Sequence, residues 1–132
     1  MSTKSVSEKL LIRPNSSVWS SHPSRIELVE PLPASVQQVD GPGAATTALV
    51  FADDSDSLRR VLDEHRGDLA APKALWVLYP KANRTDVNRD TLWPILAGYG
   101  LRPINQVAVD EVWSALRFRP LREGEPPFAP GG

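Results

Sequence analysis

The chain has 132 residues, of which 15 are basic and 16 are acidic, so its formal net charge is −1. It contains no cysteine, which excludes disulfides, thiolate catalysis and cysteine-based metal sites. The balanced charge predicts neither a general nucleic-acid-binding surface nor a membrane-binding one. No apolar run approaches the ~20 residues of a membrane span, and we expect a cytoplasmic protein.

Composition divides the chain into three parts. Residues 1–9 are rich in serine, threonine and lysine, which predicts a flexible N-terminus. Residues 10–119 carry the apolar segments and are expected to form a single domain. Residues 120–132 are rich in proline and glycine, which predicts a disordered tail.

The first half of the domain alternates strands with helical segments. Residues 17–20, 35–39 and 46–52 read as strands, and the last is apolar enough to be buried on both faces. Ser24 and Glu27 have the spacing of a capping box, which predicts a short helix between the first two strands. The three aspartates within 53–56 precede an amphipathic stripe and favour a helix N-terminus there.

The second half continues the alternation and ends in a hairpin. A buried strand is predicted over 73–79, followed by a helix whose apolar stripe covers 92–99. Pro94 is harmless in the first turn of that helix and would kink it if the helix began earlier. Strands over 104–109 and 112–119 have a short link between them, which predicts an antiparallel pair.

This order predicts an α/β fold, namely a Rossmann-like three-layer sandwich. Its sheet is mostly parallel because strands alternate with helices. The closing antiparallel hairpin is typical of methyltransferase-like members of this class. In such sheets ligands bind beyond the carboxyl ends of the strands, near the point where strand order reverses.

Two motifs resemble those of a family of small bacterial proteins known only as a domain of unknown function. Residues 76–81 match the pattern W-x-x-[WY]-P-K, and residues 110–118 match D-x-x-W-S-x-L-R-F. The resemblance covers residues 10–119 and implies a reduced, methyltransferase-like Rossmann domain. It carries no established activity.

The turn expected after the first strand, residues 20–24, contains no glycine. Dinucleotide and adenosyl-methionine sites on this fold use a glycine-rich turn that lets the backbone approach the ligand. We therefore expect no cofactor. The alternative is a divergent S-adenosylmethionine-dependent methyltransferase, in which Asp40 would bind the ribose.

Candidate ligand-binding residues follow the predicted strand ends. Lys81 should leave a central strand at its carboxyl end, where its ammonium group suits a phosphate or carboxylate. Asp86 and Arg89 follow in the next loop, where binding residues often lie. The alternative for these residues is local: an ion pair, a helix cap and a solvated arginine.

Three further candidates are His22, Trp113 and Arg117. His22 is expected beside the crevice, but no strained serine elbow accompanies it, so we do not expect hydrolase chemistry. Trp113 and Arg117 share one face of the last strand and could stack on each other or hold a ligand; otherwise they pack in the core.

Function is only loosely constrained by these patterns. Metal ligation is not expected, because the aspartates of 53–56 lack the spacing of a calcium loop and helix capping explains them. The favoured interpretation is a non-catalytic binding or regulatory domain for a small anionic ligand at the strand carboxyl ends. A protein-interaction module that uses the proline-rich tail is a further alternative.

Overall fold

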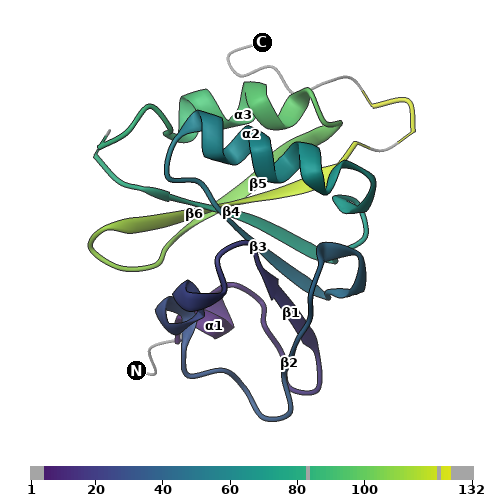
Figure 1. Cartoon of the computed structure of the whole chain (residues 1–132), viewed down its shortest axis with the longest axis vertical. Helices are drawn as coiled ribbons and strands as arrows, with labels where there is room; N and C mark the ends of the chain where they lie inside the picture. The colour runs from purple at the N-terminus through teal and green to yellow at the C-terminus, as the bar shows by residue number, and fades with distance from the viewer. Residues whose placement is uncertain (1–4, 83, 122, 126–132) are drawn as a thin grey trace.

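The computed structural model describes residues 5–82, 84–121 and 123–125. Within them, six strands form one sheet in the order β2-β1-β3-β4-β6-β5 (Figure 1). Strands β2, β1, β3 and β4 are parallel, whereas β6 runs antiparallel to both β4 and β5. This arrangement confirms the mostly parallel sheet that ends in an antiparallel hairpin. The strands are β1 (Ser17–Ser20), β2 (Gln37–Gln38), β3 (Thr47–Phe51), β4 (Ala74–Pro80), β5 (Leu101–Ala108) and β6 (Trp113–Pro120).

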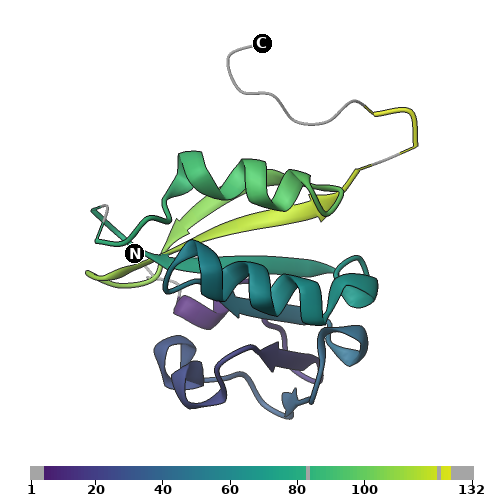
Figure 2. The same ribbon diagram turned by 45° about the horizontal axis from the view of Figure 1, so that its top comes forward.

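Helical segments cover both faces of the sheet, which gives the expected three layers. Helices α2 and α3 lie on one face, while α1 and the 3-10 helix η1 lie on the other (Figures 1 and 2). The second layer is thin because α1 is short and η1 is a single 3-10 segment. The helical elements are α1 (Val6–Lys9), η1 (Pro23–Val29), η2 (Pro42–Ala44), α2 (Ser55–Glu64), η3 (Arg66–Asp68) and α3 (Arg89–Ala97). Among the described residues, no helix is long and apolar enough to cross a bilayer.

Strands β3 and β4 form the centre of the core. Every residue of both strands is buried, as the continuous apolar runs predict. Alternate side chains point to opposite faces: Val50 and Val77 pack under α2 and α3, whereas Leu49 and Trp76 pack against the α1 and η1 layer. Because β2, β1, β3 and β4 run in the same direction, their carboxyl ends share one edge of the sheet and their amino ends share the other.

Parts of both terminal segments contact the rest of the chain. Val6–Lys9 form α1, which is capped by Ser5, and the buried Ser7 hydroxyl donates to the Pro31 carbonyl at 2.9 Å. At the other end, Glu125 pairs with Arg119 at 2.7 Å. We expected a flexible N-terminus over 1–9 and a disordered tail over 120–132. Of these, residues 1–4, 122 and 126–132 lie outside the described residues.

The capping box predicted at Ser24 and Glu27 is wrong. The N-cap is His22 rather than Ser24, so the helical segment begins two residues earlier, at Pro23, and it is 3-10 rather than α. Ser24 therefore lies inside the segment, and its hydroxyl is 2.9 Å from Nδ1 of His22. Proline fixes the first φ angle of the segment at a helical value. The segment therefore starts at Pro23, and Ser24 cannot be its N-cap.

The β5–β6 connection is longer than expected, because β5 ends at Ala108 and β6 begins at Trp113. A carboxylate stabilises the turn in place of a glycine. Oδ1 of Asp110 accepts hydrogen bonds from the backbone amides of Val112 and Trp113, both at 2.7 Å.

In α3, which begins at Arg89, Pro94 lies inside the helix.

Candidate functional site

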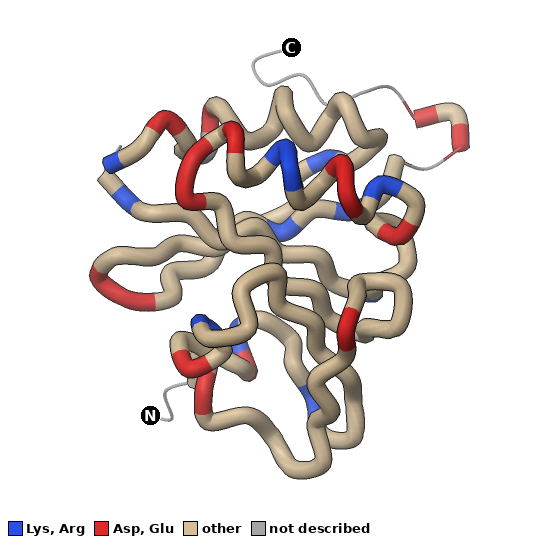
Figure 3. Tube along the Cα trace, viewed as in Figure 1, with Lys and Arg blue, Asp and Glu red and all other residues tan. Residues whose placement is uncertain are grey.

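The carboxyl edge of the sheet is where this fold class places its ligands. It is formed by the loops that follow β1, β2, β3 and β4 and by the β5–β6 turn. Acidic segments gather at the start of α2 and at the tip of the β5–β6 turn (Figure 3). A ligand that carries negative charge must therefore contact specific basic groups at this edge.

Lys81 lies at the carboxyl end of β4. Its backbone amide donates to the Val112 carbonyl at 2.7 Å, and its Nζ donates to the Asp110 carbonyl at 2.6 Å. These bonds join the two sequence motifs, since residues 76–80 of the first pair directly with residues 113–117 of the second. An ammonium group has three donors, and the residues that the structure describes accept one hydrogen bond from Nζ of Lys81.

A small polar pocket opens beside Lys81. It has a volume of about 230 Å³, and Tyr79, Lys81, Gln106 and Ser114 contribute to its lining. Nε2 of Gln106 lies 2.7 Å from the Tyr79 hydroxyl oxygen and 2.9 Å from Oγ of Ser114, both of which accept its hydrogen bonds. The pocket thus combines one cation with oriented hydroxyl and amide groups.

Asp86 lines a separate cavity of about 420 Å³ with Ser55 and Arg59, and Ser55 holds its carboxylate in place. The Asp86 carboxylate accepts from the Ser55 amide at 2.8 Å and from the Ser55 hydroxyl at 2.5 Å. The hydroxyl bond, followed by the amide bond, lowers the pKa of Asp86 below its ordinary value. Asp86 therefore caps α2 from the neighbouring loop, together with the N-cap Asp54. Arg89 begins α3, and its side chain is outside the described part of the structure.

The point where strand order reverses lies between β1 and β3. Here Nη1 of Arg25 contacts Oδ1 of Asp53 at 2.7 Å, and the Ser21 hydroxyl accepts from the Phe51 amide at 2.8 Å. These two contacts join the segment that follows β1 to the end of β3 and the loop after it, at the point where a ligand of this fold class would lie. Sequence reasoning missed Arg25, although Arg25 and Asp53 closely follow the two predicted strands that flank this point.

Trp113 contacts a cation, but that cation is Arg25 and not Arg117. The Arg25 guanidinium lies 5.1 Å from the Trp113 ring centroid and 5.6 Å from that of Phe51. The two rings meet edge to face at 5.6 Å. Arg117, four residues along β6, instead donates from Nη2 to the Lys73 carbonyl at 3.2 Å, near the amino end of β4. A stack of Arg117 on Trp113 is wrong, because four residues of extended strand separate them by roughly 13 Å.

His22 is exposed at the start of η1. Its backbone amide donates to Oγ of Ser20 at 3.2 Å, and its Nδ1 faces Ser24 Oγ. Strand β3 lies between β1 and β4, so His22 and Lys81 follow strands about 10 Å apart. At this edge Lys81 shares a pocket with Tyr79, which packs on the α2 and α3 face, whereas Trp113 meets Arg25 on the α1 and η1 face. His22 lies to one side, and Arg117 belongs to the opposite edge.

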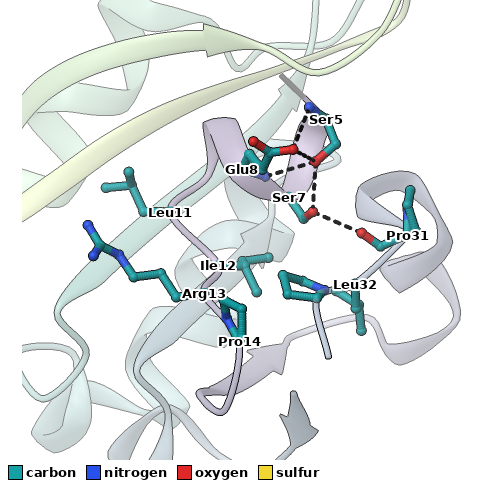
Figure 4. A pocket seen from close by; sticks show the side chains of 10 residues that line it. Ser5, Ser7, Glu8, Leu11, Ile12, Arg13, Pro14, Pro31 and Leu32 are labelled. Carbon is teal, nitrogen blue, oxygen red and sulfur yellow. Dashed lines mark hydrogen bonds between the residues drawn. The ribbon is translucent and has the colours of Figure 1, made fainter. Parts of the chain in front are cut away.

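A larger cavity lies on the α1 side of the sheet. A groove of about 630 Å³ runs beside α1, lined by Leu11, Ile12, Pro14 and residues 31–33 (Figure 4). No group of three or more histidine, aspartate or glutamate side chains within the described ranges is arranged to hold a metal ion.

Comparison with known proteins identifies the fold. No protein-family model matches the chain, and no curated protein matches it in sequence. A solved structure from Streptococcus agalactiae, described as a protein of the NADB-Rossmann superfamily, has 10% identity and a TM-score of 0.55 over 90% of this chain and 69% of its own. A putative tRNA (m1A22) methyltransferase from Streptococcus pneumoniae has 12% identity and a TM-score of 0.54 over 92% and 69%. An uncharacterised protein from Listeria monocytogenes has 11% identity and a TM-score of 0.53 over 98% and 72%.

These likenesses show that the chain has a Rossmann-like, methyltransferase-like fold, as its element order predicted. Identities this low carry fold and not activity, because one fold serves many functions.

Proposed function

We propose that this protein is a non-catalytic binding domain that receives a small anionic ligand at the carboxyl edge of its sheet. The observation that carries the proposal is Lys81, whose ammonium group lines the 230 Å³ pocket and has three donors, with one hydrogen bond accepted by the residues that the structure describes. Gln106 donates both of its amide hydrogens to the Tyr79 and Ser114 oxygens, which leaves the Tyr79 hydroxyl as a neutral donor for the ligand beside that charge. A lysine acts on phosphates and carboxylates as a point charge, so the ligand needs one such group.

Two features favour binding over methyl transfer. Pro23 stands in the first turn, so the segment lacks one amide donor where an adenosyl cofactor would approach the backbone. The Arg25–Asp53 ion pair crosses the strand-order reversal, where the cofactor would lie.

A divergent S-adenosylmethionine-dependent methyltransferase is the second candidate, and the shared fold is what favours it. Asp40, exposed just beyond β2, would then bind the ribose. The chain would also have to open the Arg25–Asp53 pair to admit the cofactor. The interaction module based on the tail depends on residues 126–132, which lie outside the described residues.

We further infer that the chain is a cytoplasmic member of the bacterial family that its motifs resemble. The two motifs pair along β4 and β6, with Trp76 opposite Arg117 and Pro80 opposite Trp113. Their spacing thus has a structural reason, because both are needed to build one strand pair and the pocket at its end.

Isothermal titration calorimetry with a panel of phosphate and carboxylate metabolites, and with S-adenosylmethionine, tests the proposal. We expect one class of anion to bind the wild type and to lose about tenfold in affinity in Lys81→Met, because a charge-assisted hydrogen bond disappears. Lys9→Met, at the end of α1, is the matched control and should bind normally. Tight binding of S-adenosylmethionine would favour the methyltransferase, and a panel without any binder would remove the proposal.

A further inference from the structure

A second cavity lies at the opposite edge of the sheet, on the α1 face. It has a volume of about 560 Å³ and opens between residues 11–16, the amino ends of β3 and β4, and the last part of β6. Three cationic residues line it, namely Arg13, Lys73 and Arg117. No acidic residue belongs to its lining within the described chain, so its charge is one-sided.

The three cations have no carboxylate partners. In the described ranges, none of them forms an ion pair within 4.0 Å. Arg117 is held in place by the bond from its Nη2 to the Lys73 carbonyl. That bond brings its guanidinium beside the start of β4, where Thr47 of β3 pairs with Ala74. Arg13 and Lys73 are exposed and Arg117 is half-buried, so an anion that enters the cavity meets three positive charges and no negative one from the part of the chain that the structure describes.

Two polar atoms at this cavity are buried without a hydrogen-bond partner. Thr47 is only 1% exposed, and its Oγ1 finds neither donor nor acceptor in the described chain. Nε of Arg117 is likewise buried and unpaired. Unpaired buried polar groups are rare, and an unseen ion or water is one of the standard reasons for them. Both groups can donate a hydrogen bond, so an acceptor in the cavity would satisfy both.

We propose that the cavity formed by Arg13, Thr47, Lys73 and Arg117 is a phosphate-binding site, distinct from the Lys81 pocket. Phosphate offers several acceptor oxygens and about two negative charges, which suits three cations and a buried hydroxyl better than a single carboxylate does. Arginine presents its donors in a planar fork that matches phosphate geometry.

The neighbouring groove indicates what else the ligand carries. The 630 Å³ groove of Figure 4 shares Leu11, Arg13 and Pro14 with the cationic cavity. Beyond these shared residues, Ile12, Pro31, Leu32 and Pro33 give the groove an apolar stretch, and Ser5, Ser7 and Glu8 line its end at α1 (Figure 4). A phosphate monoester with an apolar body therefore fits, with the phosphate on Arg117 and the body along the groove.

Titration of the full chain with inorganic phosphate and with phenyl phosphate, at matched ionic strength, tests this assignment by calorimetry. We expect saturable millimolar binding of phosphate, and tighter binding of phenyl phosphate. Arg117→Met should weaken both by about tenfold, since a charged donor is lost. Thr47→Val should weaken both by a smaller factor without destabilising the free protein, because it removes a hydroxyl that has no partner.

Lys9→Met, which removes a cation that lines neither the Lys81 pocket nor this cavity, is the control and should leave phosphate binding unchanged. If Arg117→Met does not fold, the exposed Lys73→Met provides the same test of charge. Absence of saturable binding, or equal weakening by Lys9→Met and the cavity variants, would overturn the site. The Lys81 proposal is judged separately, because its own ligand must respond to Lys81→Met and not to Thr47→Val.

Discussion

Trp76 begins the first motif, and we predict that its role is structural. Its side chain is fully buried in the centre of β4, and its Nε1 donates to the Leu10 carbonyl at 2.9 Å. This bond ties the central strand to the segment that follows α1. A Trp76→Phe variant keeps an aromatic ring but deletes the donor and part of the ring volume.

The expected loss has two parts. The Leu10 carbonyl, itself buried, would have no partner, which costs about 1–3 kcal/mol. The smaller ring leaves a cavity of roughly 40 Å³, which costs about 1 kcal/mol at ~24 cal/mol per Å³. We therefore expect the free energy of unfolding to fall by about 2–4 kcal/mol, a large part of the ~5–15 kcal/mol typical of a domain.

Urea unfolding followed by circular dichroism measures this loss, and an unchanged m-value shows that the unfolding reaction is the same. Benzothienylalanine at position 76 is the matched control, because it keeps the ring size and replaces only the N–H group. It should show the hydrogen-bond part alone. A loss below about 0.5 kcal/mol in Trp76→Phe, the range of surface substitutions, would refute the reasoning, since the Leu10 carbonyl would then not depend on the indole.

Three other predictions concern α2 and its surroundings. Asp54→Ala removes the N-cap that accepts from the Ser57 amide at 2.7 Å and should cost about 1 kcal/mol in urea unfolding, whereas Asp56→Ala should cost much less. Leu62→Ala empties a fully buried position and should cost about 2–5 kcal/mol by the same measurement. The Tyr99 hydroxyl, which donates to Oδ1 of Asp63 at 2.5 Å, is the main cause of a lowered Asp63 pKa. Tyr99→Phe should therefore raise that pKa in an NMR titration. In the wild type, the lowered pKa of Asp63 stabilises the fold above the pKa of the unfolded state, and this stability is lost as pH falls through the pKa of the folded state. In Tyr99→Phe the two pKa values are closer, so the free energy of unfolding should depend less on pH.

Local sequence determined most of the fold. The apolar runs of β3 and β4 predict strands that are buried on both faces. The alternation of strands and helices, with a hairpin at the end, limits the strand orders that the sheet can adopt. The capping box at Ser24 failed for a local reason too, because Pro23 fixes the start of η1. Residues 6–9 form α1 with a local capping box of Ser5 and Glu8, and the bonds from Ser7 to Pro31 and from Trp76 to Leu10 attach this segment to distant parts of the chain.

The candidate sites divide in the same way. The sequence predicts that Lys81 lies at the carboxyl edge, because it follows a buried strand and a proline, and Lys81 does follow the end of β4. Pairings between distant residues decided the rest: Asp86 caps a helix from another loop, Arg25 rather than Arg117 lies against Trp113, and Arg117 reaches the amino edge. The chain's own periodicity determines which face a side chain takes, but only the packed sheet determines which distant side chain it meets there, because register and layer thickness are properties of the whole structure.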